Sequence, residues 1–308
     1  TNGTNVSNTV VYIYQNGTLL LSSTSGNFST TDDTSSNNWS AGTFVDTKTD
    51  TQNVTLNTTS IDSTTKLLLH MNGTDGATST TDFSPSNHSI TFVGDAHINT
   101  SESKFGGSAV KFDGSGDRLT IPLHSDWFFE RENFTIDFWV RTTRIDITGT
   151  IMQRDDNANN KAWAIQRNPS EQMIIRYSTT GSDENYRYSN VITWNLNTWQ
   201  HVAIVRDNGT IRFFIDGVAS GTDSIGSDII FNGTEDLEIA NWAEGGSSFL
   251  GHLDEIRISK GVARWTANFT PPTQEYPTDF VPSGNYTSQV FDAGSSSTWS
   301  SLNWTNTS

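Results

Sequence analysis

The sequence predicts an all-β protein built around an antiparallel jelly-roll β-sandwich. Short apolar or alternating runs recur about every 8 to 15 residues, and almost no stretch has the period of a helix. Turn sequences separate these runs, such as "DGSGD" at 113–117 and "DNG" at 207–209, and they supply residues that tolerate positive φ. With 308 residues, the chain is long enough for one large β domain and additional strands.

Composition divides the chain into four parts. Residues 1–62 are rich in Ser, Thr and Asn and contain short β-like runs, whereas residues 63–270 carry most of the regularly spaced runs. The prolines of residues 271–284 favour an extended linker. Residues 285–308 contain two further β-like runs separated by a turn. We therefore expect a principal sandwich at 63–270 and a smaller β-sandwich module formed from the two terminal segments.

Within the principal domain, alternation predicts which side chains face the core. The run "FTIDFWVR" at 134–141 places one apolar set inward, and Trp139 then lies on the opposite face. We expect core or interlayer packing to cover Trp139, and a sugar-binding platform is the alternative. The runs "HVAIVR" and "TIRFFIDG", joined by "DNG", predict a central hairpin.

Two adjacent acids, Asp254 and Glu255, lie in "GHLDEIRISKGVARW" at 251–265. Neighbouring residues of a regular strand point to opposite faces, so we expect these two carboxylates to diverge. Glycoside hydrolysis needs two carboxyl groups that converge at about 5 to 9.5 Å. The six histidines are scattered and form no HxH or HExxH pair, which argues against zinc-dependent hydrolysis. We therefore expect a protein that is not an enzyme.

Three motifs in fixed order carry a family resemblance. They are "KFGGSAVKFDGSGDRLTIP" at 104–122, "NTWQHVAIVRDNGTIRFFIDG" at 197–217 and "GHLDEIRISKGVARWTANFTPP" at 251–272. Together they resemble the laminin-G-like, concanavalin-A-like jelly roll of many surface, adhesive and phage-tail proteins, over about two-thirds of the chain. The resemblance implies the sandwich fold for residues 63–270. It implies much less about function, because one fold hosts many activities.

The same resemblance implies a metal ligand. In related sandwiches an aspartate on the last strand helps to hold a structural Ca²⁺, and Asp254 is the matching position. Hard oxygen ligands and an acidic chain suit Ca²⁺. The alternative is that Asp254 caps a turn or pairs with Arg257 or Arg264. The fold also hosts glucan hydrolases with a Glu-x-Asp-x-x-Glu strand, but "EDLEIANWAE" at 235–244 has a different spacing.

The two ends of the chain resemble the two parts of one fibronectin-like β module. Residues 285–308 supply "SQVFDAGSSSTWSSLNWT" and residues 1–62 supply "NTVVYIYQNG". We expect the C-terminal strands of one copy to complement the N-terminal segment of the next, by strand complementation or as tandem repeats. Repeating such a head-to-tail contact produces a filament. The alternatives are closure of the module within one chain, or disordered tails.

Charge and composition limit the partners of the protein. The net charge of −16 would repel a nucleic-acid backbone, so we expect no nucleic-acid partner. The absence of cysteine excludes disulfides, thiolate metal sites and cysteine nucleophiles. No run approaches the about 18 apolar residues of a membrane helix, which argues against membrane insertion. The chain opens with "TNGTNVSNT", so we expect any export signal or anchor to lie outside these residues.

Asn-X-Ser/Thr sequons are unusually frequent. The sequence contains seventeen of them, whereas its composition would give roughly seven by chance. This excess favours covalent N-glycans on an extracellular or cell-surface protein. The alternative is that Asn, Ser and Thr are simply the common turn and strand residues of an acidic β protein. The predicted acceptors are Asn2, Asn5, Asn16, Asn27, Asn38, Asn53, Asn57, Asn72, Asn87, Asn99, Asn133, Asn208, Asn232, Asn268, Asn285, Asn303 and Asn306.

These observations favour a structural role. We expect an N-glycosylated extracellular filament or surface-array protein whose main partner is another copy of itself. The alternative is a carbohydrate-binding adhesin or phage tail-fibre module that recognises cell-surface carbohydrate through the jelly roll.

Overall fold

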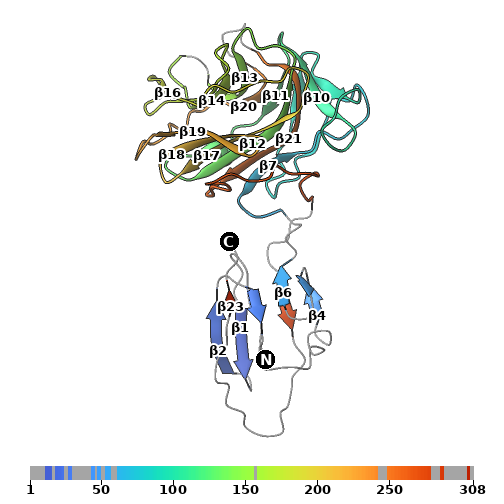
Figure 1. The fold of residues 1–308 in the computed structure, drawn as a ribbon, viewed down its shortest axis with the longest axis vertical. Coiled ribbons are helices and arrows are strands. Elements are labelled where there is room, and N and C mark those ends of the chain that lie inside the picture. The colour runs from blue at the N-terminus through green and yellow to red at the C-terminus, as the bar shows by residue number, and fades with distance from the viewer. Residues whose placement is uncertain are drawn as a thin grey trace. The chain divides into compact units, whose positions relative to one another are not determined.

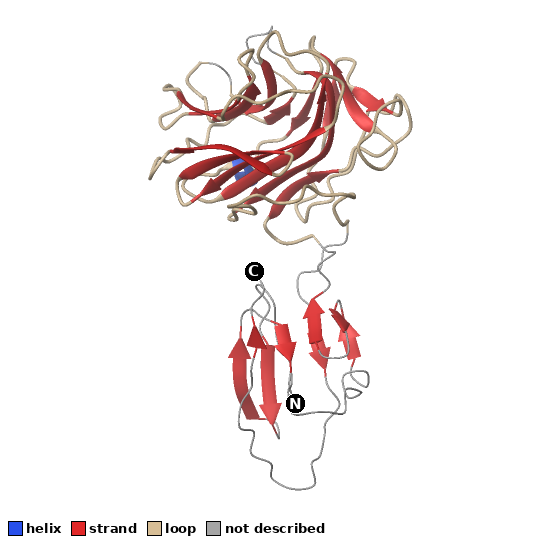
Figure 2. Ribbon diagram, in the orientation of Figure 1, coloured by secondary structure: helices blue, strands red, loops and turns tan. Residues whose placement is uncertain are grey.

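The computed structural model describes residues 61–155, 158–241 and 248–278, and the backbone of short strands nearer the two ends of the chain. Strands dominate, and the helical content of the described residues is the 3₁₀ turn η2 (Ser125–Trp127) (Figure 2). The predicted all-β jelly-roll sandwich is confirmed. Among the described residues, no helix combines the length and the apolar character needed to cross a bilayer.

The chain forms two compact units. One is Ser63–Thr278, and the other combines Thr1–Asp62 with Asp279–Ser308. The larger unit contains two antiparallel sheets packed as a sandwich, drawn as two layers in Figure 1.

The eight-stranded sheet has the order β19-β18-β17-β12-β21-β10-β9, and β7 also pairs with β21. Its strands are β7 (Thr65–Leu69), β9 (His97–Asn99), β10 (Ala109–Asp113), β12 (Phe134–Thr142), β17 (Gln200–Asp207), β18 (Thr210–Ile215), β19 (Val218–Ser224) and β21 (Leu250–Lys260).

The seven-stranded sheet has the order β16-β15-β14-β13-β20-β11-β8. Its strands are β8 (Thr91–Val93), β11 (Arg118–Ile121), β13 (Gly149–Arg154), β14 (Trp163–Arg167), β15 (Met173–Tyr177), β16 (Asn185–Tyr188) and β20 (Leu237–Ile239).

The core lies between the two sheets. On β12, Phe134, Ile136 and Phe138 are fully buried in one cluster with Trp127 and Trp163, so the inward set predicted for this strand is confirmed. Burying one large apolar side chain contributes about 1.5–3 kcal/mol. The alternation of large apolar residues is therefore enough to orient the strand.

The predicted central hairpin is also confirmed. Strands β17 and β18 pair from Val202↔Ile215 to Asp207↔Thr210. The two turn residues, Asn208 and Gly209, have φ values of 47° and 79°. Positive φ at both positions is typical of the type I′ turn, whose twist matches that of the two strands in a two-residue hairpin.

The prediction that Asp254 and Glu255 point to opposite faces is wrong. The register of the β12–β21 pairing shifts between the pairs Asp137↔Arg257 and Trp139↔Asp254. Strand β21 therefore contains a bulge. Glu255 has a φ of 49° at this bulge. Leu253 and Ile256 both lie in the core although they are three residues apart. The bulge thus resets the alternation and places both acids on the outer face.

The smaller unit combines strands from both ends of the chain. Strand β22 (Asn285–Thr287) pairs with β4 (Thr43–Val45), and β23 (Trp304–Thr305) pairs with β3 (Asn27–Ser29). This is the closure within one chain that we considered as an alternative. Exchange of these strands between copies stays a prediction. The remaining strands of the unit are β1 (Val11–Gln15), β2 (Thr18–Ser23), β5 (Thr47–Thr49) and β6 (Asn53–Leu56).

Candidate functional site

Asp254, the predicted Ca²⁺ ligand, is fully buried on β21. Its Oδ2 accepts the backbone N–H groups of Lys104 and Phe105 at 2.8 and 3.1 Å, and its Oδ1 accepts that of Glu255 at 2.9 Å. Burial raises the pKa of Asp254 to about 8. No group of three metal-ligating His, Asp or Glu side chains in the described residues includes Asp254. Calcium binding by Asp254 stays a prediction.

Glu255 is also closed off from solvent, at 1 % exposed. Its Oε1 lies 2.6 Å from Nδ1 of His70, and its Oε2 accepts the backbone N–H of Tyr276 at 2.9 Å. Because the carboxylates of both Asp254 and Glu255 are buried and hydrogen-bonded, a substrate has no access to this pair.

The outer face of the eight-stranded sheet is covered by the chain that follows β21. Trp265 and Phe269 stack at 3.9 Å between ring centroids and pack against a small apolar cluster of this face. Tyr276 donates a hydrogen bond to Asp137 at 2.6 Å. Residues 271–278, which we expected to begin a linker, therefore contact the domain. The part of this face over the central strands is closed by its own chain.

Trp139 lies on the same covered face and is 5 % exposed. The ammonium of Lys104 lies 3.7 Å from the centre of its ring, and Phe105 meets the ring edge-on at 5.9 Å. The predicted interlayer packing of Trp139 is thus confirmed.

The outer face of the seven-stranded sheet carries a transverse row of mainly polar side chains. Directly paired residues share one face of a sheet, and the neighbours of this row, such as Met152 and Ile165, face the core. From β11 to β16 the row consists of Thr120, Glu238, Gln153, Ala164, Arg176 and Tyr186.

One half of the row is centred on Glu238. Its Oε2 accepts hydrogen bonds from Gln153 at 3.0 Å and Asn241 at 2.8 Å, and its Oε1 pairs with Arg118 at 3.1 Å. The Oε1 atom of Gln153 is buried and has no hydrogen-bond partner among the described residues. A buried acceptor without a partner costs free energy.

The other half is centred on Glu184. It pairs with Lys161 at 2.6 Å and Arg176 at 2.9 Å, and it accepts the hydroxyl of Tyr186 at 2.5 Å. Arg176 also pairs with the buried Asp155. The hydrogen bonds from Lys161 and Tyr186 lower the pKa of Glu184 to about 2. Glu184 is therefore a fixed negative charge at the edge of the row.

Two tyrosines are exposed beside this charge cluster. Tyr186 and Tyr188 are 36 % and 44 % exposed. Their ring centroids lie 6.2 Å apart, and the angle between the ring planes is 18°. Both project from the outer face of β16, because they pair with Arg176 and Ile174 of β15. Flat aromatic surface and charged hydrogen-bonding groups thus lie next to each other.

The predicted N-glycan acceptors lie partly within the described domain. Four of them are exposed, namely Asn72, Asn87, Asn208 and Asn268, and three are half-buried, namely Asn99, Asn133 and Asn232. The side chains of the other ten lie outside the described residues. Glycosylation stays a prediction.

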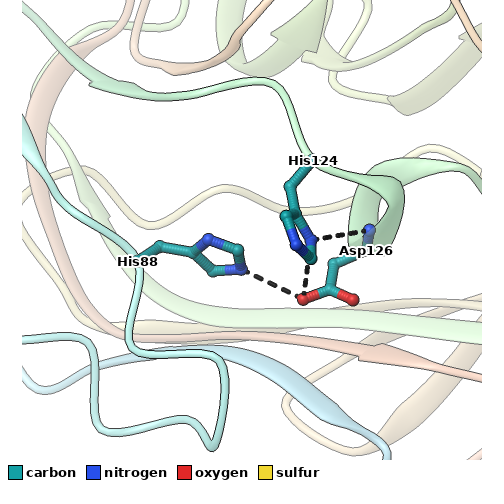
Figure 3. A group of neighbouring side chains, drawn as sticks. All are labelled: His88, His124 and Asp126. Carbon is teal, nitrogen blue, oxygen red and sulfur yellow. Dashed lines mark hydrogen bonds and ion pairs between the residues drawn. The ribbon is translucent and has the colours of Figure 1, made fainter.

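Sequence reasoning missed a compact cluster of His88, His124 and Asp126, drawn in Figure 3. The local signal for this cluster is the His124-Ser-Asp126 sequence, because two side chains that are two residues apart can converge on one side of a turn. The third member, His88, comes from a different loop, so scattered histidines in the sequence meet in space.

Comparison with known proteins identifies the fold family. The model of a family described as the concanavalin A-like lectin/glucanases superfamily (Laminin_G_3) matches residues 113–266. Over 132 residues the chain is 23% identical to adhesion G-protein coupled receptor V1 of Danio rerio, a match that covers 41% of this chain and 2% of the receptor.

Two toxin binding domains are among the solved structures that this chain resembles. The binding domain of Paraclostridial mosquitocidal protein 1 matches with a TM-score of 0.52 and 15% identity, over 65% of this chain and 49% of that chain. The binding domain of botulinum neurotoxin serotype G matches with a TM-score of 0.49 and 16% identity, over 66% of this chain and 48% of that chain. The chain thus spans about half the length of these toxin domains and a small part of the receptor.

Proposed function

The chain belongs to the concanavalin A-like lectin/glucanases superfamily, and from that premise we propose that it is an extracellular adhesion module that binds carbohydrate. The proposed surface is the outer face of the seven-stranded sheet. The name of the receptor that it resembles, an adhesion receptor, supports the same class of function. We propose binding without catalysis.

The observation that carries the proposal is the exposed tyrosine pair at the end of the polar row. A sugar ring has an apolar C–H face and an edge of hydroxyl groups. Tyr186 and Tyr188 offer exposed ring surface to the first. Glu184 and Lys161, whose side chains are partly exposed, offer a charged acceptor and a charged donor to the hydroxyl groups, and charge-assisted hydrogen bonds are the stronger kind.

A glycan array followed by calorimetric titration of the best oligosaccharide tests this proposal. Tyr188→Ala should weaken binding about tenfold, because it removes a stacking surface worth about 1 kcal/mol or more. Tyr188→Phe keeps the ring and should bind like the parent. Val218→Ala is the matched control, since Val218 is 59 % exposed on the other sheet. Saturable binding that Tyr188→Ala leaves unchanged would place the sugar elsewhere.

A second candidate function is head-to-tail assembly. It is favoured because strands from both ends of the chain build the smaller unit. Strands β22 and β23 of the C-terminal segment pair with β4 and β3 of the N-terminal segment. A module completed by two distant parts of one chain can also be completed by parts of two chains, as in strand donation. We propose that exchange of these strands builds filaments.

An engineered disulfide distinguishes closure from exchange. Thr43 and Thr287 are directly paired across β4 and β22, and the chain has no cysteine of its own. The double variant Thr43→Cys, Thr287→Cys should form a ladder of covalent oligomers on a non-reducing gel if strands are exchanged. A single monomer band would show closure within one chain and would overturn the filament proposal. Each single-cysteine variant is a control for random crosslinking.

A further inference from the structure

We propose that His88, His124 and Asp126 form a binding site for one divalent transition-metal ion of the Zn²⁺ class. This site lies in loops of the larger unit, and it is separate from both Asp254 and the tyrosine pair. The inference does not depend on the proposed carbohydrate binding.

The three side chains converge on one point. Nε2 of His88 lies 3.1 Å and Nδ1 of His124 lies 3.2 Å from the same Oδ2 of Asp126. All three ligand atoms lie within 4.8 Å of one another. Figure 3 shows both imidazole rings directed at this carboxylate. Ligand atoms that share a Zn²⁺ at about 2.0–2.2 Å are at most about 4.4 Å apart. Only a small movement of one ring is required.

His124 is the ring that can make this movement. Its side chain is 49% exposed, whereas those of His88 and Asp126 are 9% and 13% exposed. Two ligands are therefore held in place and the third faces solvent. An exposed ligand also gives the ion a route into the site and leaves room for a water ligand or an external ligand.

Neighbouring groups hold the two buried ligands in position. Ser86 donates its hydroxyl to Oδ2 of Asp126 at 2.6 Å. The backbone N–H of His88 is bound by Asp82 at 2.8 Å, and the His88 ring packs 4.6 Å from the ring of the buried Trp127. Such partners orient metal ligands and are worth about 10- to 100-fold in affinity.

The contacts of His124 are compatible with a cation at this point. Nδ1 of His124 accepts the backbone N–H of Asp126 at 3.2 Å, and the same nitrogen lies 3.2 Å from Oδ2 of Asp126. A neutral imidazole nitrogen either accepts or donates, so it cannot satisfy both neighbours. When it accepts, its lone pair faces the lone pairs of a carboxylate. Either an Nδ1–H tautomer that donates to the carboxylate, or an ion bound by both atoms in place of the contact to the backbone N–H, removes this repulsion.

The donor set selects the class of metal. Two imidazole nitrogens and one carboxylate oxygen suit Zn²⁺ and neighbouring transition metals, whereas Ca²⁺ and Mg²⁺ prefer oxygen ligands alone. The chain contains no cysteine, so no thiolate competes for the ion.

Calorimetric titration of the full chain with Zn²⁺ at about pH 7.5, where histidine is mostly neutral, tests the site. We expect one ion per chain. His124→Ala should lower the affinity at least about tenfold, and Ser86→Ala should lower it about tenfold. His97→Ala is the matched control and should bind like the parent, because His97 is a partly exposed histidine outside the cluster. Circular dichroism checks that each variant is folded.

Co²⁺ supplies a spectroscopic readout. Histidine-bound Co²⁺ of low coordination number absorbs visible light strongly, so the parent should show this absorption and His124→Ala should lose it. The proposal is overturned if Zn²⁺ shows no saturable binding, or if His88→Ala and His124→Ala bind it as tightly as the parent. In the first case the cluster would be a hydrogen-bonded histidine–aspartate network only.

Discussion

Arg257 on β21 donates two hydrogen bonds to the carboxylate of Asp137 on β12, at 2.9 and 3.3 Å. Asp137 is fully buried, and the hydroxyl of Tyr276 contacts the same carboxylate at 2.6 Å. The pair therefore joins the two central strands to the segment that covers them. Such a buried pair is costly to break, because removing one partner leaves an uncompensated charge.

Asp137→Asn should lower the free energy of unfolding by about 3 kcal/mol at neutral pH, since Arg257 loses its counter-ion. Chemical denaturation measures this change. Asp146→Asn is the matched control, because Asp146 pairs with Arg144 at 2.8 Å but is 75 % exposed. Exposed pairs contribute less than about 1 kcal/mol. Equal losses in both variants would contradict the assigned role of Asp137.

The same pair predicts acid sensitivity. Although burial would raise the pKa of Asp137, Arg257 and His201 lower it to about 2, below the ordinary value of 3.8. A depressed folded-state pKa adds stability that is complete above about pH 4 and is lost as the pH falls from about 4 to about 2. Unfolding curves across this range should flatten in Asp137→Asn. An unchanged acid slope in the variant would assign the sensitivity to another carboxylate.

Asp254 predicts the opposite pH dependence. Burial raises its pKa to about 8 from 3.8, so its contribution to stability is complete below about pH 4 and is lost as the pH rises to about 8. Asp254→Asn cannot ionise and should reduce this alkaline loss, measured by denaturation between about pH 5 and 8. Added Ca²⁺ should raise the melting temperature of the parent and not that of the variant if Asp254 is a ligand.

The features that the sequence predicts correctly are those that local contacts determine. The inward set on β12 follows from alternation, and the β17–β18 hairpin follows from its Asn208-Gly209 turn. The bulge at Glu255 had no such signal, because a non-glycine residue with a φ of 49° looks like an ordinary strand residue. The cluster of His88, His124 and Asp126 depends on two loops meeting, since His88 and His124 are far apart in sequence.

N-glycosylation should follow exposure within the larger unit. Asn72, Asn87, Asn208 and Asn268 are exposed, whereas Asn232 is half-buried. Because the acceptor must reach the transferase, we expect higher occupancy at the four exposed sites. Site-resolved mass spectrometry of protein secreted from a eukaryotic host measures this. Complete occupancy at Asn232 with none at the exposed sites would contradict the expectation.

Gly217 allows the covering segment to close over the sheet. It has a φ of 76°, and a β-carbon there would collide with the carbonyl oxygen of Phe269. Gly116 has a φ of 81° but has no neighbour in the space of a β-carbon. Both alanine variants lose about 1 kcal/mol from the left-handed backbone, and Gly217→Ala should lose about 1–3 kcal/mol more from overpacking.

Displacement of the segment should also expose Trp265, which stacks on Phe269. Gly217→Ala should therefore show more quenching of tryptophan fluorescence by acrylamide than Gly116→Ala does, in addition to its greater loss of stability. If both variants unfold at the same denaturant concentration and are quenched equally, only the backbone conformation matters at Gly217. The close approach of Phe269 would then contribute nothing to holding the segment on the sheet.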